Sequence, residues 1–249
     1  MDICILSSGR AGRQATWSAL PAAIQAKTKI VIPAGEEHHY AKFPHISVPV
    51  KGIGPTRQWV IDNCSDKVVM LDDDLTFAVR RGDNPAKFVP ATDKDVEDMF
   101  NTIWGLLDKY AHVGVAGREG GNRVISRFIH TTRMIRILAY DARVLRKAKV
   151  RFDALEVMED FHTTLRLLRL GFDNILLNHI VHNQYGSNTA GGCSQYRTPE
   201  MQELAANLLK EHHPDFVKVV KKQTKVAWGG MRERSDVIIQ WKRAFQADI

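Results

Sequence analysis

The chain has 249 residues and a formal net charge of +7, with a sequence pI of about 9.4. Apolar residues make up 44% and charged residues 25% of the chain, which is typical of a globular protein with a sizeable core and excludes a disordered or fibrous class. Its three cysteines are odd in number and far apart, which excludes a disulfide framework and a cysteine zinc site, and neither a signal peptide nor a membrane-spanning segment is expected.

The first 75 residues alternate between short apolar runs and segments with helical character. Strands are expected at 2–6, 29–33, 45–50 and 68–71, and helices at 16–26 and 56–63. Pro21 falls within the first helix and should bend or split it. Strands and helices at this spacing favour a Rossmann-like sheet. We therefore predict an α/β fold with a mostly parallel central sheet flanked by helices.

The rest of the chain continues this alternation and then changes character. Thr92 and Asp95 form a capping-box pattern at the start of a helix over 94–110. Further elements are expected as a strand at 113–117, partly helical structure over 134–147, a helix at 161–170 and a strand at 174–181. From residue 199 the tail is expected to be mainly helical. We therefore predict one α/β domain over 1–198, with 199–249 as a helical extension packed on it.

Three consecutive carboxylates, Asp72, Asp73 and Asp74, directly follow the apolar 68–71 strand. Open α/β sheets bind their ligands at the carboxyl ends of the strands. Three adjacent like charges repel, so a cation is expected beside them, and hard oxygen ligands suit Mg²⁺ or Mn²⁺. The simpler interpretation is an acidic turn in contact with water.

A second carboxylate pair, Glu159 and Asp160, begins the helix that covers 161–170. Carboxylates are favourable at a helix N-terminus, where the helix dipole should lower their pKa, so a capping role alone would explain them. The following strand leads into His179 and His182. Either histidine could bind a metal, or could be an ordinary core residue.

The positive charge is concentrated in residues 118–151, where ten cationic residues face two acidic ones, a surplus of eight. The ten are Arg118, Arg123, Arg127, Arg133, Arg136, Arg143, Arg146, Lys147, Lys149 and Arg151. A basic surface of this kind attracts nucleic acid or phosphorylated nucleotides. A solvated face with acidic partners elsewhere is the alternative.

Five sequence blocks, in this order, carry a resemblance to a known family. They are Ser7–Arg10, Gly52–Trp59, Leu71–Asp74, Met158–Phe161 with Thr164–Arg169, and 187–198. Together they resemble the phage TET-associated glycosyltransferase family, a branch of the GT-A nucleotide-sugar glycosyltransferases, from residue 3 to about residue 200. The resemblance implies a GT-A fold and transfer of a sugar from a UDP-sugar to 5-hydroxymethylcytosine in DNA. It also implies the cytoplasm of a phage-infected bacterial host as the location.

The resemblance assigns roles to individual residues. Asp74 and Asp72 would hold Mn²⁺ or Mg²⁺, and His182 would complete the metal site, with His179 as the reserve. Asp160 would be the general base of an inverting reaction, with Glu159 beside it, because a carboxylate can take the proton of an alcohol as it attacks. The residues expected around the donor nucleotide are Ser8, Arg10, Arg57, Asp72, Asp73 and Arg118.

Three other functions remain open at this stage. The acceptor could be a small molecule or a glycan, in which case the basic stretch would serve only the nucleotide diphosphate. The segment 8–13 faintly resembles the basic glycine-containing loop of nucleotidyltransferases, which share the acidic metal site. A non-catalytic DNA-binding module is the third, although no helix-turn-helix or zinc-finger pattern supports it.

Overall fold

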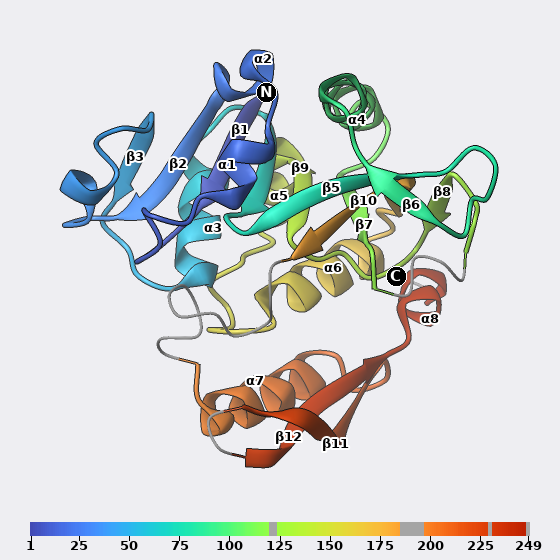
Figure 1. The fold of residues 1–249 in the computed structure, drawn as a ribbon. Coiled ribbons are helices and arrows are strands. Elements are labelled where there is room, and N and C mark those ends of the chain that lie inside the picture. Colours follow the sequence, from blue (N-terminus) through green and yellow to red (C-terminus); the bar gives the residue numbers. More distant parts are fainter. Residues whose placement is uncertain (120–123, 185–196, 229–230, 248–249) are drawn as a thin grey trace.

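Alternate residues of strand β1 (Asp2–Leu6) are buried in two separate apolar layers. Ile3 and Ile5 belong to one layer, and Cys4 and Leu6 to the other. A strand that is apolar on both faces must lie inside a sheet that is covered on both sides. The computed structural model describes residues 1–119, 124–184, 197–228 and 231–247, and it has this arrangement (Figure 1).

Ten strands of the described chain form one central sheet, in the order β3-β2-β1-β4-β9-β7-β10-β5-β6, with β8 paired to β10. Their bounds after β1 are β2 (Thr28–Pro33), β3 (His45–Val48), β4 (Lys67–Asp72), β5 (Leu75–Arg80), β6 (Phe88–Pro90), β7 (His112–Gly117), β8 (Phe128–His130), β9 (Ile137–Asp141) and β10 (Asn174–Gln184). The pairs among β1 to β4 are parallel, and so is β7 with β10, whereas β5, β8 and β9 run the other way. The expected mostly parallel α/β sheet is confirmed.

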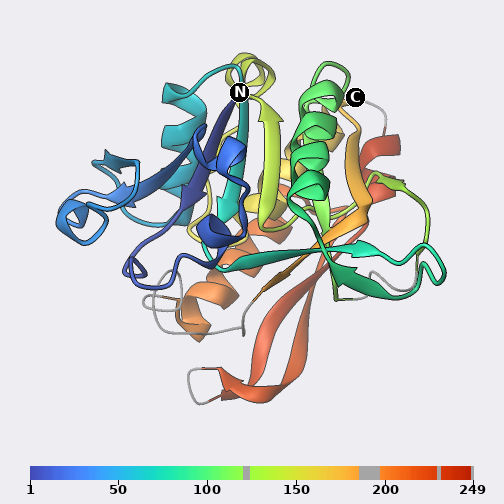
Figure 2. The same cartoon turned by 45° about the horizontal axis from the view of Figure 1, so that its top comes forward.

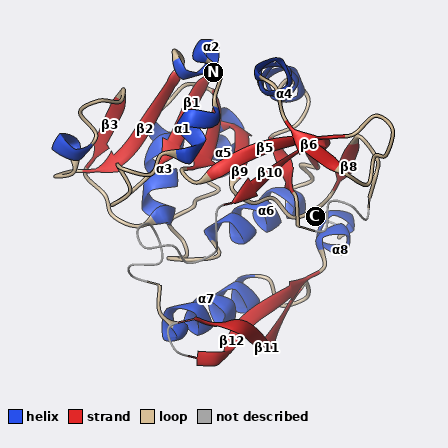
Figure 3. Ribbon diagram, in the orientation of Figure 1, coloured by secondary structure: helices blue, strands red, loops and turns tan. Residues whose placement is uncertain are grey.

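Helices cover both faces of this sheet (Figure 3). The helices are α1 (Ala15–Ala19), α2 (Ala22–Gln25), α3 (Ile53–Asn63), α4 (Asp93–Leu106), α5 (Ala142–Ala148) and α6 (Glu159–Arg169), with a short 3-10 turn at Glu37–His39. Side chains of α2 and α4 pack in the layer of Ile3 and Ile5, and those of α3, α5 and α6 in the layer of Cys4 and Leu6. The predicted split of the first helix at Pro21 and the capping box at Thr92 are both present.

The prediction for 134–147 was only half right. Ile137–Asp141 is strand β9, which lies antiparallel between β4 and β7, and only Ala142–Ala148 is helical. Every residue of β9 is buried. A short, continuous apolar run has the same appearance in a buried strand and a buried helix, so its periodicity could not decide between them.

The tail is not mainly helical, so the prediction of helical structure over residues 199–249 was wrong. Helix α7 (Pro199–His212) is followed by an antiparallel hairpin of β11 (Val217–Trp228) and β12 (Met231–Ile239), and then by the short helix α8 (Trp241–Gln246). Val217 and Val219 of β11 point into an apolar cluster with α7, a period of two that is the signature of a strand. Figure 2 shows the hairpin extending away from the central sheet.

The tail contacts the sheet domain through α6. Leu165 of α6 shares an apolar cluster with Ala205 and Leu209 of α7 and with Phe216. This burial supplies the packing between the two parts of the chain. Among the helices described, none is long and apolar enough to cross a membrane.

Candidate active site

The acidic triplet lies at the carboxyl end of β4, as the sequence predicts. Asp72 is the last residue of the strand, and Asp73 and Asp74 form the turn into β5. Thr16 of α1 is buried against this turn, and its hydroxyl donates to the Asp72 carbonyl at 2.6 Å and accepts from the Leu75 N–H at 2.8 Å. The Thr16 N–H donates to the Asp73 carbonyl at 3.1 Å. Three hydrogen bonds to one buried residue therefore hold the turn in place.

Asp73 is enclosed by a polar network beneath β1. Its Oδ2 accepts a hydrogen bond of 2.5 Å from Ser7, and its Oδ1 accepts one of 2.9 Å from Arg10. Tyr40 and Gln14 each lie 2.8 Å from the Ser7 Oγ. A hydroxyl has one proton to donate, and Ser7 gives it to Asp73, so Tyr40 and Gln14 act as its donors. Asp73 is only 3% exposed, and its contacts with Ser7 and Arg10 are those of a buried residue that supports the site.

Asp74 has a different environment from Asp73. Its Oδ2 accepts hydrogen bonds from Arg10 at 3.2 Å and from Gln184 of β10 at 2.9 Å. Its Oδ1 is buried without a hydrogen-bond partner among the described residues. A buried carboxylate oxygen without a partner is costly, and it is the kind of atom that binds a cation.

Arg57 joins the triplet to the second carboxylate pair. Its Nη1 donates to the Glu159 Oε1 at 2.5 Å, and its Nη2 to the Asp72 Oδ1 at 3.4 Å. Arg57 and Glu159 are only 5% and 4% exposed, whereas the Asp72 side chain is 28% exposed. One buried guanidinium therefore ties the start of α6 to the end of β4, although these carboxylates are 87 positions apart in the sequence.

A close backbone approach places Arg57 at this point. A Cβ on Gly54 of α3 would lie 2.9 Å from the carbonyl oxygens of both Phe152 and Leu155. The side-chain carbonyl of Gln58 accepts a buried hydrogen bond of 2.9 Å from the Phe152 N–H. These contacts hold the first turns of α3 against the segment that leads into α6. Glycine is required at 54 because any side chain would separate the two segments.

The electrostatics of this centre follow from three carboxylates near one guanidinium. Burial acts to lower the pKa of Arg57, but Glu159, Asp72 and Asp160 together raise it above its usual range. Burial raises the pKa of Glu159 to about 7, with Arg57 opposing the shift and Asp160 adding to it. Burial and the neighbouring Asp74 and Asp73 raise the pKa of Asp72 to about 6, again against Arg57. One positive charge cannot neutralise three carboxylates, so the pKa values of Glu159 and Asp72 stay raised in spite of Arg57.

The two carboxylates at the start of α6 have different surroundings. Glu159 is buried and paired, and the expectation that the helix dipole lowers its pKa is wrong because burial outweighs the dipole. Asp160 is half-buried, and its Oδ1 accepts a hydrogen bond of 2.9 Å from the Phe161 N–H. Arg57 and Glu159 thus form an internal pair, while Asp160 retains contact with solvent.

Backbone strain occurs beside both carboxylate groups. Met158, directly before Glu159, has a φ of 62°. Arg136 also has a φ of 62°, and its carbonyl accepts a hydrogen bond of 3.0 Å from the Asp72 N–H. The left-handed region costs a residue other than glycine about 1–2 kcal/mol. Conformations of this kind persist where the surroundings impose them, and they cluster at functional sites.

The residues expected to bind the metal are only partly brought together. Both ring nitrogens of His182 are buried without a hydrogen-bond partner among the described residues, and burial lowers the pKa of this histidine to about 3, so the ring is neutral. A neutral imidazole and the unpartnered Asp74 Oδ1 are suitable donor atoms for a divalent cation. In the described part of the chain, however, no three His, Cys, Asp or Glu side chains are grouped closely enough to hold one. Metal binding by Asp72, Asp74 and His182 stays a prediction.

The two candidate histidines have different surroundings. His182 is separated by one residue from Gln184, which binds Asp74, so both side chains lie on the same face of β10. His179 is half-buried, and its ring packs edge-on against Phe128 with the centroids 6.0 Å apart. A register shift in the pairing of β10 with β7 separates the two histidines. His182 is therefore the one on the side of the triplet.

Two residues expected around the donor have other contacts here. The Ser8 hydroxyl donates to the Glu36 Oε1 at 2.9 Å, and Glu36 also accepts from the Gly9 N–H at 2.8 Å. The exposed Arg118 has its guanidinium 6.0 Å from the ring of Phe88. Arg10, in contrast, binds Asp73 and Asp74 directly. Of the expected donor-binding residues, Arg10 thus pairs with Asp73, and Arg57 pairs with Asp72. Among the described residues, Ser8 and Arg118 contact other groups instead.

The sequence of this chain matches one known protein family. The TET-Associated Glycosyltransferase family matches residues 1–192, which is more than half of the chain. The chain belongs to this family. The members of this family are described as glycosyltransferases. A search of curated proteins found no match.

The solved structures that are similar to this chain include a TarS protein and a synthetase. A crystal structure of S. aureus TarS, residues 1–349, is 12% identical with a TM-score of 0.46, and the match covers 85% of this chain and 65% of that one. The present chain thus spans less than two thirds of that structure's length. A CMP:2-keto-3-deoxy-manno-octonic acid synthetase complexed with CTP is 13% identical with a TM-score of 0.42, over 84% of this chain and 98% of that one.

The basic stretch of this TET-associated glycosyltransferase is not one open cationic face. Arg123 lies outside the described residues, and four of the other arginines are in ion pairs. These pairs are Arg136–Glu119 at 3.1 Å, Arg143–Asp141 at 2.8 Å, Arg146–Asp66 at 2.6 Å and Arg151–Asp153 at 2.6 Å. These pairs favour the alternative of a solvated face with acidic partners, and binding of polyanions by residues 118–151 stays a prediction.

Several residues of the site escaped sequence analysis. Ser7, Gln14, Thr16, Tyr40 and Gln184 contact the triplet or its supporting network. They are uncharged polar residues of common types. Only Ser7 stood within a recognised block, and nothing in the local pattern marks the others, because their partners are distant in the sequence. The family block at 187–198 lies almost entirely outside the described residues.

Proposed function

We propose that this glycosyltransferase transfers a sugar from a UDP-sugar to the hydroxymethyl group of 5-hydroxymethylcytosine in DNA, with inversion and with Asp160 as the general base. Family membership supports the sugar transfer. The contrast between Glu159 and Asp160 supports the choice of base. Glu159 is only 4% exposed and held by Arg57, whereas Asp160 is half-buried and can meet an acceptor.

The donor would lie at the carboxyl ends of β1 and β4. Sugar transfer leaves negative charge on the departing diphosphate, and cations placed beforehand near it lower the barrier. Arg10 is the cation within reach on the triplet side, since its Nη1 lies 2.9 Å from Asp73 and 3.2 Å from Asp74. Its guanidinium would exchange part of this pairing for donor phosphates. We assign Ser8 and Arg118 to the donor only through the family resemblance.

A divalent cation, Mn²⁺ or Mg²⁺, would be held by Asp74 with Asp72, and His182 is the nitrogen ligand that fits best. When bound, it would neutralise charge on the diphosphate. The unpartnered Asp74 Oδ1 and the buried, neutral ring of His182 support this assignment. Residues of the chain itself carry out the other steps of the reaction. Arg57 holds Glu159 in place, and Asp160 takes the proton of the acceptor hydroxyl as attack proceeds.

The proposed enzyme also includes the tail. We assign residues 1–198 to the glycosyltransferase domain and residues 199–249 to an extension packed on it, which the apolar cluster between α6 and α7 supports. The enzyme would act in the cytoplasm of a phage-infected bacterium, where modified DNA is present. This location rests on the family resemblance alone.

A small-molecule or glycan acceptor is the second candidate, and one observation favours it. Four arginines of the basic stretch are already neutralised by Glu119, Asp141, Asp66 and Asp153. A DNA acceptor would therefore have to use the other cations of the chain, whereas a small acceptor would need none of them.

The decisive experiment is incubation with a panel of UDP-sugars and DNA that contains 5-hydroxymethylcytosine, followed by nucleoside mass spectrometry. We expect a mass increase of one sugar on the modified nucleoside, abolished by chelation of divalent cations. Free 5-hydroxymethyl-2′-deoxycytidine and simple glycans serve as competing acceptors. Transfer to a glycan but never to DNA would reject the DNA acceptor. A product with retained anomeric configuration would remove Asp160 from the base role.

A further inference from the structure

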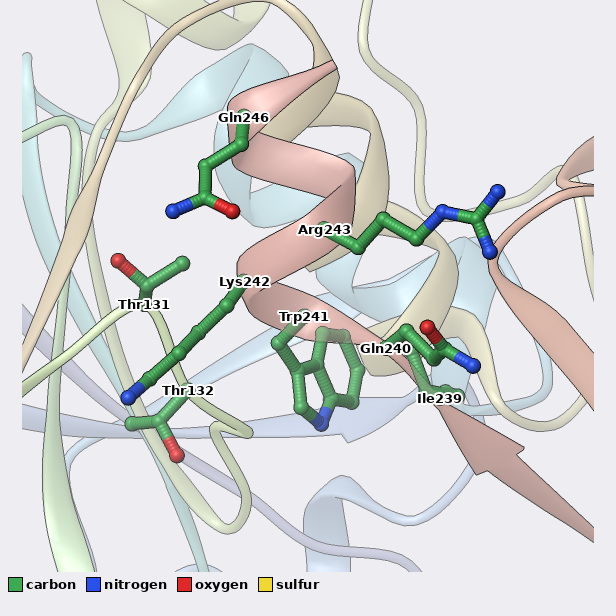
Figure 4. Close-up of a pocket in the computed structure, with 8 residues that line it drawn as sticks. All are labelled: Thr131, Thr132, Ile239, Gln240, Trp241, Lys242, Arg243 and Gln246. Atoms are coloured by element: carbon green, nitrogen blue, oxygen red, sulfur yellow. The ribbon is translucent and has the colours of Figure 1, made fainter.

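A hollow of about 520 Å³ lies between α8 and the residues that follow β8. Its lining is formed by Thr131, Thr132, Ile239, Gln240, Trp241, Lys242, Arg243 and Gln246. Figure 4 shows Lys242 extending from α8 toward Thr132, whereas Arg243 extends away from it. None of these eight residues is acidic, so this "α8 hollow" has the composition of an anion site.

The cations around the α8 hollow are not neutralised. Lys242 and Arg243 are exposed, and so is Arg133, which follows the two lining threonines in the chain. Within the described residues, none of the three has an ion-pair partner, in contrast to Arg136, Arg143, Arg146 and Arg151. Unpaired surface cations in one place are free to bind phosphate groups.

Aromatic rings accompany these cations. The Trp241 ring packs edge-on against Phe161 with the centroids 5.8 Å apart, and the Arg133 guanidinium lies 4.7 Å from the centre of the Phe161 ring. Trp241 and Phe161 pack against the apolar cluster between α6 and α7 on one side and are partly exposed. Cations interleaved with accessible aromatic rings are the combination that binds nucleic-acid strands, because phosphates pair with the cations and bases stack on the rings.

The position of the hollow connects it to the active site. Phe161 directly follows Asp160 in the first turn of α6. A strand bound at Trp241 would therefore run beside the turn that carries the candidate base. Helix α8 in turn packs against α6 through the same Trp241–Phe161 contact, which gives the tail a fixed position relative to the catalytic carboxylate.

We propose that the α8 hollow is the docking site for the nucleic-acid acceptor, in which Lys242 contacts a phosphate inside the hollow, Arg133 and Arg243 contact phosphates beside it, and Trp241 stacks on a base. This assignment rests on the proposed DNA acceptor and adds the surface that binds it. An acidic peptide would satisfy the cations but would offer no base to the aromatic ring. The tail thereby becomes the acceptor-binding part of the enzyme.

The first test is a pair of matched charge reversals. Arg133→Glu with Lys242→Glu changes one exposed lysine that lines the hollow and one exposed arginine next to it. Lys109→Glu with Lys147→Glu changes two exposed lysines elsewhere by the same net charge. Binding of hydroxymethylated oligonucleotides is measured by fluorescence anisotropy from 50 to 200 mM salt. We expect at least a tenfold weaker affinity and a salt slope smaller by about two for the hollow variant, and little change for the control.

The second test separates base stacking from charge. Trp241→Leu removes the aromatic platform but keeps an apolar side chain against Phe161. Stacking contributes enough that oligonucleotide affinity should fall about tenfold. Inorganic polyphosphate, which has charge but no bases, should bind the wild-type protein and this variant equally. Equal losses for both ligands would show that Trp241 affects only the structure, and would overturn the assignment.

Sugar transfer to free 5-hydroxymethyl-2′-deoxycytidine distinguishes failure of this proposal from failure of the proposed function. If the Arg133/Lys242 variant modifies the free nucleoside as well as wild type but DNA poorly, the docking site is supported. If both charge-reversal variants modify DNA like wild type, the docking site is wrong and the DNA acceptor stands. If wild type neither binds nor modifies DNA, both are wrong.

Discussion

Two charged regions of the molecule differ in whether their charges are paired within the chain. At the end of β4, the carboxylates of Asp72, Asp73 and Asp74 meet Arg10, Arg57 or buried polar groups inside the same chain. Around the α8 hollow, Lys242 and Arg243 have no carboxylate partner among the described residues. Internal pairs fix positions, whereas unpaired charges at the surface remain available for an external ligand.

The first two residues of helix α6 show the same difference. Glu159 and Asp160 are adjacent, yet Glu159 is buried in an ion pair and Asp160 faces partly outward. Removing a buried partner should therefore damage the structure, and removing an accessible group should damage only the reaction.

The largest effect is expected for Asp160→Asn. An amide cannot accept the acceptor proton, so kcat should fall by about 10²–10⁴-fold. Because Asp160 is half-buried and has no ion pair with another described residue, the urea midpoint of unfolding should stay near the wild-type value. Steady-state kinetics and urea titration measure both quantities. Asp153→Asn, which alters a surface pair with Arg151, is the control and should leave kcat unchanged.

Arg57→Met should lower the free energy of unfolding by about 3–5 kcal/mol, because it leaves the buried Glu159 carboxylate without its partner. Arg151→Met removes an arginine from an exposed pair and should cost no more than about 1 kcal/mol. Urea unfolding compares the two variants. Similar small losses in both would show that the Arg57–Glu159 pair has no structural role.

The stability difference between Glu159→Gln and wild type should depend on pH. The pKa of Glu159 is raised from 4.5 to about 7 in the folded protein, so wild type loses stability as pH rises through this range, and the amide variant lacks this loss. Relative to wild type, the variant should therefore gain on the order of 3 kcal/mol between about pH 4.5 and pH 7. Urea titrations at pH 5 and pH 7.5 measure this. A difference that shrinks with rising pH would mean that the folded pKa is lowered.

Gly54→Ala should destabilise the protein by about 1–3 kcal/mol, because the new Cβ would lie 2.9 Å from two backbone carbonyl oxygens. It should also move Arg57 relative to Glu159 and reduce kcat. Gly105→Ala is the matched control, since Gly105 lies in helix α4 with nothing within 4 Å, and it should be neutral or stabilising by up to about 1 kcal/mol. Thermal unfolding and kinetics follow both variants.

Much of the fold could be read from the chain, and the failures have a common cause. Helix α4, with its capping box, and the apolar strand β4 appeared almost as predicted, because periodicity and caps are local signals. Strand β9 and the hairpin of β11 and β12 were missed, since their partners supply the hydrogen bonds. The site divides in the same way. Asp72–Asp74 and Glu159–Asp160 were visible as motifs, but Thr16 and Gln184 were not.

The sequence by itself determined that two carboxylate groups end one strand and begin one helix, in the order of a glycosyltransferase. Only the tertiary structure decided which carboxylates are neutralised within the protein. Gly54 lets α3 approach the segment before α6, and this contact brings Arg57 to Glu159 and Asp72. The physical reason is that burial and pairing depend on groups far apart along the chain, whereas a motif records only which groups are present.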